Sequence, residues 1–325
     1  MEAAGALPLV SVCIPAYKRP AMLALALRSA VEQGYEPLEV VVGDDSPDEA
    51  AIAVIESVRA ATHVPVRYRR NEPHLGQSAN VDQLFIDAQG RYLILLHDDD
   101  VLLPGAIARM MAPVLKDPRV RVTFGKQTYI DERGATLVGE TETRNRLFNG
   151  DLAGAVANPI EACLLQQFPN DSFLIDSALA RDVGYHSDID TTVAVDVDFG
   201  IRLGRALVPG EMAFVDAFVG GYRRSSDAIS ASPAWRRWDH PADAVKLYGA
   251  VSSLDLPASS EYARRAFLKT VIDALVKGLA QRRQRATALR LFLSSLYGWR
   301  KRFSLRGMYH LSLIAFPALD RLRRY

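Results

Sequence analysis

The sequence contains few cysteines, and it has no long apolar run, internal repeat or low-complexity tract. Cys13 and Cys163 are the only cysteines, and Cys13 lies in the apolar stretch LVSVCIP, so we expect no disulfide framework and a reducing compartment. No window of about 18 uninterrupted apolar residues occurs, which argues against a membrane-spanning helix. The first residues show no basic segment followed by an apolar one, so we expect no secretory signal and a cytoplasmic protein.

Charge is unevenly distributed along the 325 residues, although the net charge is only +1. Residues 259–325 hold 15 Lys and Arg against 3 acidic residues, so residues 1–258 carry an excess of acid. We therefore expect one globular domain over 1–258 and a basic helical region over 259–325. No basic and aromatic recognition module is visible, so we expect no nucleic-acid partner.

Strand and helix patterns alternate in the first 126 residues, because short apolar runs are followed by longer runs with helical spacing. Strands are predicted over 9–15, 38–45, 66–71, 91–97 and 121–125, and helices over 20–33, 48–61, 77–88 and 104–116. This alternation predicts an α/β fold with a mostly parallel sheet flanked by helices. In such sheets ligands bind at the carboxyl ends of the strands.

Acidic residues lie at the carboxyl ends of two of these predicted strands. Asp44 and Asp45 end one strand, and Asp98, Asp99 and Asp100 follow another. At an effective dielectric of about 20, two unit charges roughly 4 Å apart repel by about 4 kcal/mol, so the acidic triplet requires water or a cation. Carboxylate oxygens are the ligands that a hard divalent cation prefers. The alternative is a solvated charged loop.

Four stretches of the sequence resemble, in order and spacing, the family 2 glycosyltransferases of the GT-A fold. They are VSVCIPAYKRP, VVVGDDSPDE, NEPHLGQSANVDQLFIDAQGRYLILLHDDDVLLPGAI and VDVDFGIRL. The resemblance covers about residues 9–225 and implies a GT-A (Rossmann-like) domain. Its nucleotide-binding half would span about 1–126, and its acceptor-facing half about 127–258.

The resemblance also implies an activity of the bacterial cell-envelope type. Such enzymes are inverting transferases that take a sugar from a nucleotide-diphosphate sugar and use Mg²⁺ or Mn²⁺. For this chain we expect a UDP-sugar or a dTDP-sugar as the donor. The implied acceptor is a saccharide or a lipid-linked molecule in polysaccharide or glycoconjugate synthesis.

Most of the implied site residues lie in the first half of the domain. Asp98, Asp99 and Asp100 carry the family's Asp-x-Asp type metal motif, with His97 where many relatives have an Asp, and Asp99 is the leading metal ligand. The implied nucleotide site contains Pro15, Ala16, Tyr17, Arg19, Asp44, Asp45, Gly76, Asn80 and Asp98. Helix capping is the alternative for Asp44 and Asp45, and a plain helix start is the alternative for Gly76 and Asn80.

The second half of the domain carries the implied catalytic base. Asp196 in VDVDFGIRL falls on that position, with Val195 where relatives have Glu, and helix capping is its alternative role. Arg223 and Arg224 in GGYRRSSDAIS fall on a loop that faces the diphosphate, although serines stand where a His is common.

The basic region predicts helices over 259–283, 284–299 and 304–325. Apolar residues of the last helix form a rough stripe flanked by arginines: Leu305, Met308, Leu311, Leu313, Ile314 and Leu319. Residues 300–325 are therefore expected to lie on an anionic membrane, peripherally at the inner face of the plasma membrane. The alternative is that they pack on the body or on a second subunit, as in a homo-oligomer.

Two rival functions remain open from the sequence. A sugar nucleotidyltransferase would be expected to carry a Gly-rich loop with basic residues after the first strand, and PAYKRPAML lacks the glycines. A catalytically silent nucleotide-sugar-binding scaffold would bind the donor without breaking it, so hydrolysis of the donor would count against it.

Overall fold

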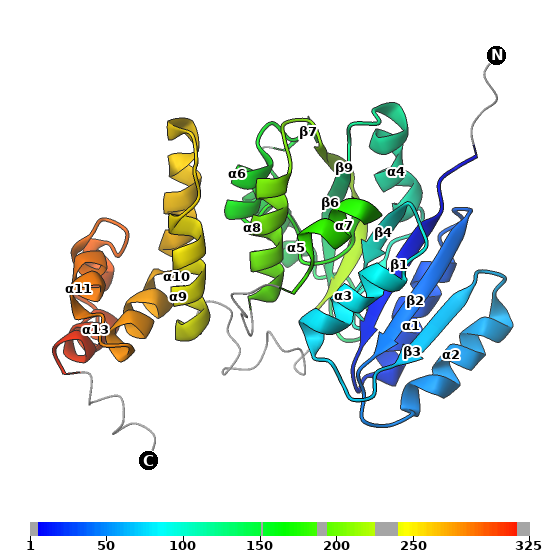
Figure 1. Cartoon of the computed structure of the whole chain (residues 1–325), viewed down its shortest axis with the longest axis horizontal. Helices are drawn as coiled ribbons and strands as arrows, with labels where there is room; N and C mark the ends of the chain where they lie inside the picture. The colour runs from blue at the N-terminus through cyan, green and yellow to red at the C-terminus, as the bar shows by residue number, and fades with distance from the viewer. Residues whose placement is uncertain (1–5, 151, 187–193, 225–239, 317–325) are drawn as a thin grey trace. The chain divides into compact units, whose positions relative to one another are not determined.

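The computed structural model describes residues 6–150, 152–186, 194–224 and 240–316 (Figure 1). The chain divides into two compact units. The first unit consists of Met1–His186 and Arg202–Ser225, and the second of Ser187–Ile201 and Ser226–Tyr325. Within the described ranges, no helix has both the length and the apolar character needed to cross a membrane.

A nine-stranded sheet forms the centre of the first unit, in the order β3-β2-β1-β4-β8-β6-β9-β5, with β7 paired to β9. The strands are β1 (Val10–Ala16), β2 (Leu38–Asp44), β3 (Val66–Arg70), β4 (Tyr92–Leu95), β5 (Val101–Leu102), β6 (Val122–Ile130), β7 (Gly154–Ala155), β8 (Phe173–Asp176) and β9 (Met212–Arg223). β3, β2, β1 and β4 are parallel, and β6 is parallel to β9. The remaining pairings, β4 with β8, β6 with β8, β5 with β9 and β7 with β9, are antiparallel.

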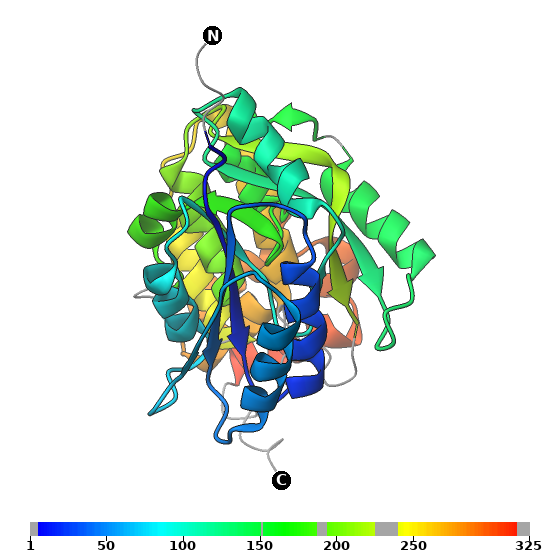
Figure 2. The same ribbon diagram turned by 90° about the vertical axis from the view of Figure 1, so that its right-hand side faces the viewer.

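Helices cover both faces of the parallel part of the sheet, because β1 is apolar on both of its faces (Figures 1 and 2). Val12 and Ile14 belong to the core cluster shared with α1 (Pro20–Val31) and α2 (Ala50–Ala61). Cys13 points to the other face, where its thiol donates to the Leu84 carbonyl oxygen of α3 (Gln77–Asp87) at 3.7 Å. Burial in this apolar layer raises the pKa of Cys13 far above its usual value, so the thiol is inert.

The α/β fold and the alternating elements of the first 126 residues are confirmed, including α4 (Ala106–Lys116). The mostly parallel sheet is correct for the four N-terminal strands, whereas the other half of the sheet is mixed. The sequence did not predict β8 as a strand because FLID is short. It also did not predict α5 (Val138–Asn149), because that helix is largely polar and presents little apolar surface to a core.

Further short helices complete the part of the first unit that follows β6. They are α6 (Pro159–Leu164), α7 (Ser177–Val183) and the C-terminal part of α8 (Val195–Ala206), whose residues up to Ile201 belong to the second unit. The side chain of Asp176 caps α7 by accepting from the Leu179 amide at 3.0 Å. Arg202 donates to the carbonyl oxygens of Gly184 and Tyr185, which fixes the chain after α7.

The described residues of the second unit from Pro241 onward are mainly helical. The helices that the sequence predicts from residue 259 onward lie in this unit, whereas the helix over Pro241–Ser252 was not predicted. The elements from Pro241 onward are α9 (Pro241–Ser252), a 3-10 turn (Ala258–Ser260), α10 (Glu261–Gln281), α11 (Arg285–Leu293), α12 (Trp299–Arg302) and α13 (Leu305–Ala315). α10 is the central helix, and it packs against α9, α11 and α13. Gly278 permits the close approach of α9, because a Cβ at this position would overlap the Pro241 carbonyl oxygen. The predicted helix 284–299 is shorter than expected and ends at Leu293.

Candidate functional site

Three parallel strands bring the predicted site residues to one edge of the sheet. In the register of β1, Ala16 lies opposite Asp44 of β2, and Cys13 lies opposite Leu95 of β4. The carboxyl ends of these strands therefore lead into neighbouring loops, which hold Tyr17 to Arg19, Asp45 and Ser46, and the acidic triplet. This is the edge at which ligands bind in α/β sheets.

Asp98 fixes the loop after β1 to the loop after β4. Its carboxylate accepts from the Tyr17 amide at 3.0 Å and from an Arg19 nitrogen at 2.5 Å. The other terminal nitrogen of Arg19 donates to Asp99, so one guanidinium lies between two carboxylates. Burial raises the pKa of Asp98 to about 6, although Arg19 acts in the opposite direction. Arg19 thus provides part of the positive charge that the acidic triplet requires.

Asp100 lies deeper, and its partners come from the other half of the unit. It is almost completely buried and accepts from the Arg223 amide at 2.6 Å. Its carboxyl group also lies beside the buried carboxyl group of Asp171. Burial and this neighbouring carboxylate raise the pKa of Asp100 well above its usual range.

Asp171 lies in the loop before β8, and polar groups of two other segments contact its carboxylate oxygens. Gln127 of β6 donates to it at 3.0 Å, and the His97 amide lies 3.4 Å from its other oxygen. Burial raises the pKa of Asp171 as well. The pair of Asp100 and Asp171 therefore links the loop after β4 to the antiparallel half of the sheet.

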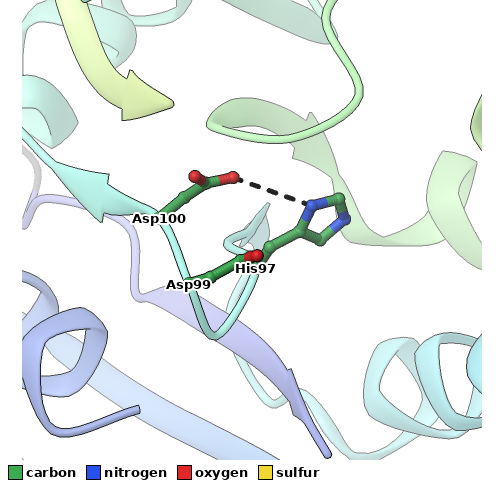
Figure 3. Close-up of side chains that lie close together, drawn as sticks. All are labelled: His97, Asp99 and Asp100. Atoms are coloured by element: carbon green, nitrogen blue, oxygen red, sulfur yellow. Dashed lines mark ion pairs between the residues drawn. The ribbon is translucent and has the colours of Figure 1, made fainter. Parts of the chain in front are cut away.

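His97, Asp99 and Asp100 form a cluster of metal-ligating side chains (Figure 3). One ligand atom from each lies within 4.8 Å of the other two, and the His97 Nδ1 is 3.8 Å from an Asp100 oxygen. The His97 Nε2 is buried and has no hydrogen-bond partner among the described residues. Two carboxylates suit Mg²⁺ or Mn²⁺, and a nitrogen ligand is compatible with Mn²⁺, so the donor set fits a divalent cation.

Asp45 holds the segment between β3 and α3. Its carboxylate accepts from the side chain of Asn71 at 2.9 Å and from the amides of Leu75 and Gly76, both at 2.7 Å. Gly76 adopts a φ of 83° at the N-terminus of α3, a conformation that glycine adopts without strain. A carboxylate offers about four acceptor positions, and these three hydrogen bonds leave one position of Asp45 unused.

Asp44 and Asn80 are buried next to this segment. Asp44 accepts from the Ser46 amide and from the Tyr68 hydroxyl, each at 2.9 Å. Asn80 donates to the Gly43 carbonyl oxygen at 2.7 Å and accepts from the Asn71 side chain at 2.9 Å. Neither Asp44 nor Asp45 caps α2, because the N-cap of that helix is Glu49.

Gly43 is required by this network, because a Cβ at position 43 would lie well inside van der Waals contact with the Asn80 Oδ1. We expect Gly43→Ala to lower the free energy of unfolding by about 1–3 kcal/mol, as overpacking in a tight core does. Urea denaturation would measure the loss. Gly139→Ala in α5 is the matched control, since nothing lies within 4 Å of a Cβ there. Equal stability of the two variants would contradict this packing.

A small hollow lies beside the loop after β1. Its lining includes Ala16, Tyr17, Arg19 and Asp44, which are four of the residues that the sequence predicts at the nucleotide. Lys18 and Ser46 also line it, and the Lys18 amide donates to the Ser46 hydroxyl at 2.8 Å. Pro15 stands at the end of β1 opposite Gly43, close behind this loop.

The two arginines at the end of β9 have different surroundings. Arg223 is buried, and its guanidinium donates to the carbonyl oxygens of Asp99, Asp131 and Glu132. It therefore holds the acidic loop through the backbone carbonyl oxygen of Asp99. Arg224 is partly exposed and forms an ion pair with Glu140 at 2.9 Å. The serines that follow these arginines in the sequence lie outside the described residues.

Asp196 is the second residue of α8, so it is not the N-cap of that helix. Its side chain is partly buried, and it accepts from the Val197 amide at 2.9 Å. It belongs to the second unit, whereas the acidic cluster belongs to the first. Its role as a base stays a prediction. Asp198 differs from it in being almost completely buried.

Sequence reasoning missed Asp171, Gln127 and Asn71. Asp171 precedes a short strand that the sequence did not predict, so no strand end marked it as a site residue. Gln127 lies at a register shift between β6 and β9, which only the folded sheet shows. Asn71 directly follows β3, and the strand-end argument applied to Asp44 and Asp45 could have found it.

Comparison with known proteins agrees with this geometry. Residues 11–163 match the family model described as glycosyl transferase family 2. An uncharacterised protein of Mycobacterium tuberculosis is 40% identical over 211 residues, which are 60% of this chain and 62% of that protein. The GalNAc(5)-diNAcBac-PP-undecaprenol beta-1,3-glucosyltransferase of Campylobacter jejuni is 28% identical over 106 residues, 32% of this chain and 34% of its own length. The chain thus spans less than two thirds of either relative.

Solved structures share the fold. A crystal structure of S. aureus TarS (residues 1–349) superposes with a TM-score of 0.61 at 16% identity, over 94% of this chain and 87% of the other. The same protein in complex with UDP-GlcNAc superposes with a TM-score of 0.56 at 15% identity, over 87% of each chain. The fold that the motifs predicted is therefore confirmed, and the family resemblance is supported by the match of residues 11–163, just under half of the chain, to glycosyl transferase family 2.

Proposed function

We propose that the chain is an inverting, divalent-metal-dependent glycosyltransferase that moves a sugar from a nucleotide-diphosphate sugar to a hydroxyl group. The observation that carries the proposal is the cluster of His97, Asp99 and Asp100 beside the loop after β1, at the carboxyl edge of the parallel strands. The TarS complex with UDP-GlcNAc supports a nucleotide-sugar donor, and we propose a UDP-sugar or a dTDP-sugar.

The acidic cluster would hold Mg²⁺ or Mn²⁺ through Asp99 and Asp100, with His97 as a nitrogen ligand. Such a cation, when bound, neutralises the charge that develops on the departing diphosphate. Asp98 has a different task in this proposal, because both of its oxygens already bind the loop after β1. It positions Tyr17 and Arg19, and Arg19 is then placed to approach the diphosphate.

The nucleoside would lie against the hollow lined by Ala16, Tyr17 and Asp44. Asp45 keeps one acceptor position after its three internal hydrogen bonds, which suffices for one N–H group of a base. Gly76 and Asn80 act indirectly in this proposal, because they hold the segment that faces Asp45.

Inversion requires a base on the face of the sugar opposite the departing diphosphate. We assign this role to Asp196, because it is a partly buried carboxylate in the first turn of α8 and a carboxylate can accept the proton of the acceptor hydroxyl. Arg223 supports the acidic loop rather than the donor, since its guanidinium donates to three carbonyl oxygens. Arg224 remains the arginine proposed to reach the diphosphate.

The acceptor is proposed to be a saccharide or a lipid-linked molecule in bacterial polysaccharide synthesis, at the cytoplasmic side of the membrane. The Campylobacter relative supports a lipid-linked acceptor, because its name includes an undecaprenol carrier. The putative colanic acid biosynthesis glycosyl transferase WcaA of Escherichia coli supports polysaccharide synthesis.

Release of UDP from UDP-sugars without an acceptor tests the activity, because many transferases slowly pass the sugar to water. We expect slow UDP release that requires Mn²⁺ or Mg²⁺ and is lost on chelation. A silent scaffold would bind the nucleotide but release no nucleoside diphosphate from either a UDP-sugar or a dTDP-sugar, and that result would overturn the proposal. A nucleotidyltransferase would instead release pyrophosphate from a nucleoside triphosphate and a sugar phosphate.

A further inference from the structure

The last two helices of the second unit expose an unusual amount of apolar surface. Five large apolar side chains between residues 299 and 316 are more than 60% exposed: Trp299, Phe303, Leu305, Met308 and Phe316. We call these five side chains the apolar surface of the second unit. Soluble surfaces usually bury or disperse such large side chains, so a concentration of this kind marks an interaction site.

The apolar surface is not the inner face of α13. Gly307, His310 and Ile314 face the interior of the unit, where His310 accepts a hydrogen bond from, or donates one to, the Tyr297 hydroxyl at 2.8 Å. Leu305 and Met308 lie three residues apart on the opposite side of the helix and are exposed. α13 therefore has one apolar face that is already packed and a second that the described residues of its unit leave exposed.

This arrangement corrects the single stripe expected from the sequence. Leu313 and Ile314 are buried in the unit, whereas Leu305, Met308 and Leu311 are exposed. The sixth member of the expected stripe, Leu319, lies outside the described residues. Trp299 and Phe303, which the stripe did not include, extend the exposed surface onto α12 and the residue after it.

The part of the sequence that carries this surface is basic. Residues 274–319 contain nine Lys and Arg and no acidic residue. Arg300 stacks on Trp299, with its guanidinium carbon 5.4 Å from the ring centroid. Lys301 and Arg306 form ion pairs with Asp273, and Arg290 is exposed on α11. Acidic protein partners and anionic lipids both attract such charge, but exposed Trp and Phe beside arginines are typical of residues at a membrane interface.

We propose that α12 and α13 dock the protein peripherally on an anionic lipid bilayer, with Trp299, Phe303, Leu305 and Met308 inserted among the lipid headgroups. α13 is too short to span a bilayer, so it would lie in the plane of the interface. Arg300 and Arg290 would contact the lipid phosphates. This proposal does not depend on the transfer reaction, since none of these residues belongs to the proposed donor site.

Sedimentation with vesicles tests the docking surface in the full chain. The vesicles contain phosphatidylcholine with or without phosphatidylglycerol. We expect the wild type to sediment only with phosphatidylglycerol, and less of it as salt is raised, because ionic strength screens the attraction. The double variant Trp299→Ser, Phe303→Ser is expected to bind the vesicles at least about tenfold more weakly than the wild type, since it lacks the two largest inserted side chains.

Two further variants separate apolar insertion from charge and from general surface change. Arg290→Gln with Arg300→Gln is expected to weaken binding roughly tenfold and to reduce its dependence on salt. Ile86→Ser with Leu147→Ser is the matched control, because these side chains are 62% and 69% exposed in the first unit. The control is expected to bind as the wild type does.

The competing occupant is a second copy of the chain. Membrane docking would be overturned by three results together: the wild type forms a dimer, it does not bind vesicles, and the Trp299→Ser, Phe303→Ser variant is a monomer. Vesicle binding that all four proteins share equally would overturn it as well. UDP release in vesicle-free solution is expected to be unchanged in the Trp299→Ser, Phe303→Ser variant, so failure of this proposal is distinguishable from failure of the proposed activity.

Discussion

Asp99→Ala is expected to lower metal-dependent turnover by about 10³-fold or more, because loss of a ligand removes several kcal/mol of charge stabilisation. Asp99 is the acid of the triplet whose removal leaves the fold least affected. Its side chain is 15% exposed and pairs with Arg19, whereas Asp98 and Asp100 are buried and accept backbone amides. The measurement is UDP release from the donor at several Mn²⁺ concentrations.

The same variant is expected to lose the metal-dependent part of nucleotide binding while its circular dichroism and melting curve without ligand stay near wild type. Glu56→Ala is the matched control, since this carboxylate is exposed on α2 and pairs with the neighbouring Arg59. Normal turnover by Asp99→Ala would show that the acidic triplet is a charged loop and nothing more.

Asp196→Asn is expected to reduce transfer to an acceptor by about 10² to 10⁴-fold, the usual contribution of a general base. The substitution keeps the size of the side chain and its place in the first turn of α8 but removes its basicity. Binding of the donor and of the metal should stay near wild type, because the proposed base contacts the acceptor hydroxyl. Single-turnover transfer and nucleotide binding, measured on the same protein, separate the two effects.

Asp182→Asn is a suitable control for this experiment, because Asp182 is an exposed acid in α7. Asp198→Asn is less informative, since Asp198 is buried and its loss would disturb the packing of α8. Near-wild-type transfer by the Asp196→Asn variant would show that Asp196 is not the catalytic base. Loss of donor binding together with transfer would indicate a structural role instead.

The parallel half of the fold could be predicted from the sequence because its signals are local. β1, β2 and β4 are short apolar runs, and acidic residues mark the carboxyl ends of β2 and β4 at one edge of the sheet. The family motifs lie in the same segments, so the fold and the donor-side residues were predicted together. Tyr17, Arg19 and Asp98 are indeed joined by hydrogen bonds.

The remaining features depend on contacts between segments distant in the sequence. Asp171 meets Asp100 only because β8 pairs antiparallel with β4, and no local pattern encodes that pairing. The role of Arg223 as a support for the acidic loop likewise depends on the pairing of β5 with β9. In the basic region, helical spacing alone could not separate the packed face of α13 from its exposed face.

Thermal unfolding of the wild type with UDP, GDP, dTDP and CMP, each with and without Mn²⁺, tests the proposed donor site most directly. A ligand at about 100 times its dissociation constant adds about 2.7 kcal/mol of stability. For a unit of this size that corresponds to a rise of about 5 to 10 °C in melting temperature. We expect such a rise with UDP or dTDP in the presence of Mn²⁺ and a much smaller one without it. Unchanged melting with all four nucleotides in both conditions would contradict a metal and nucleotide site at this edge of the sheet.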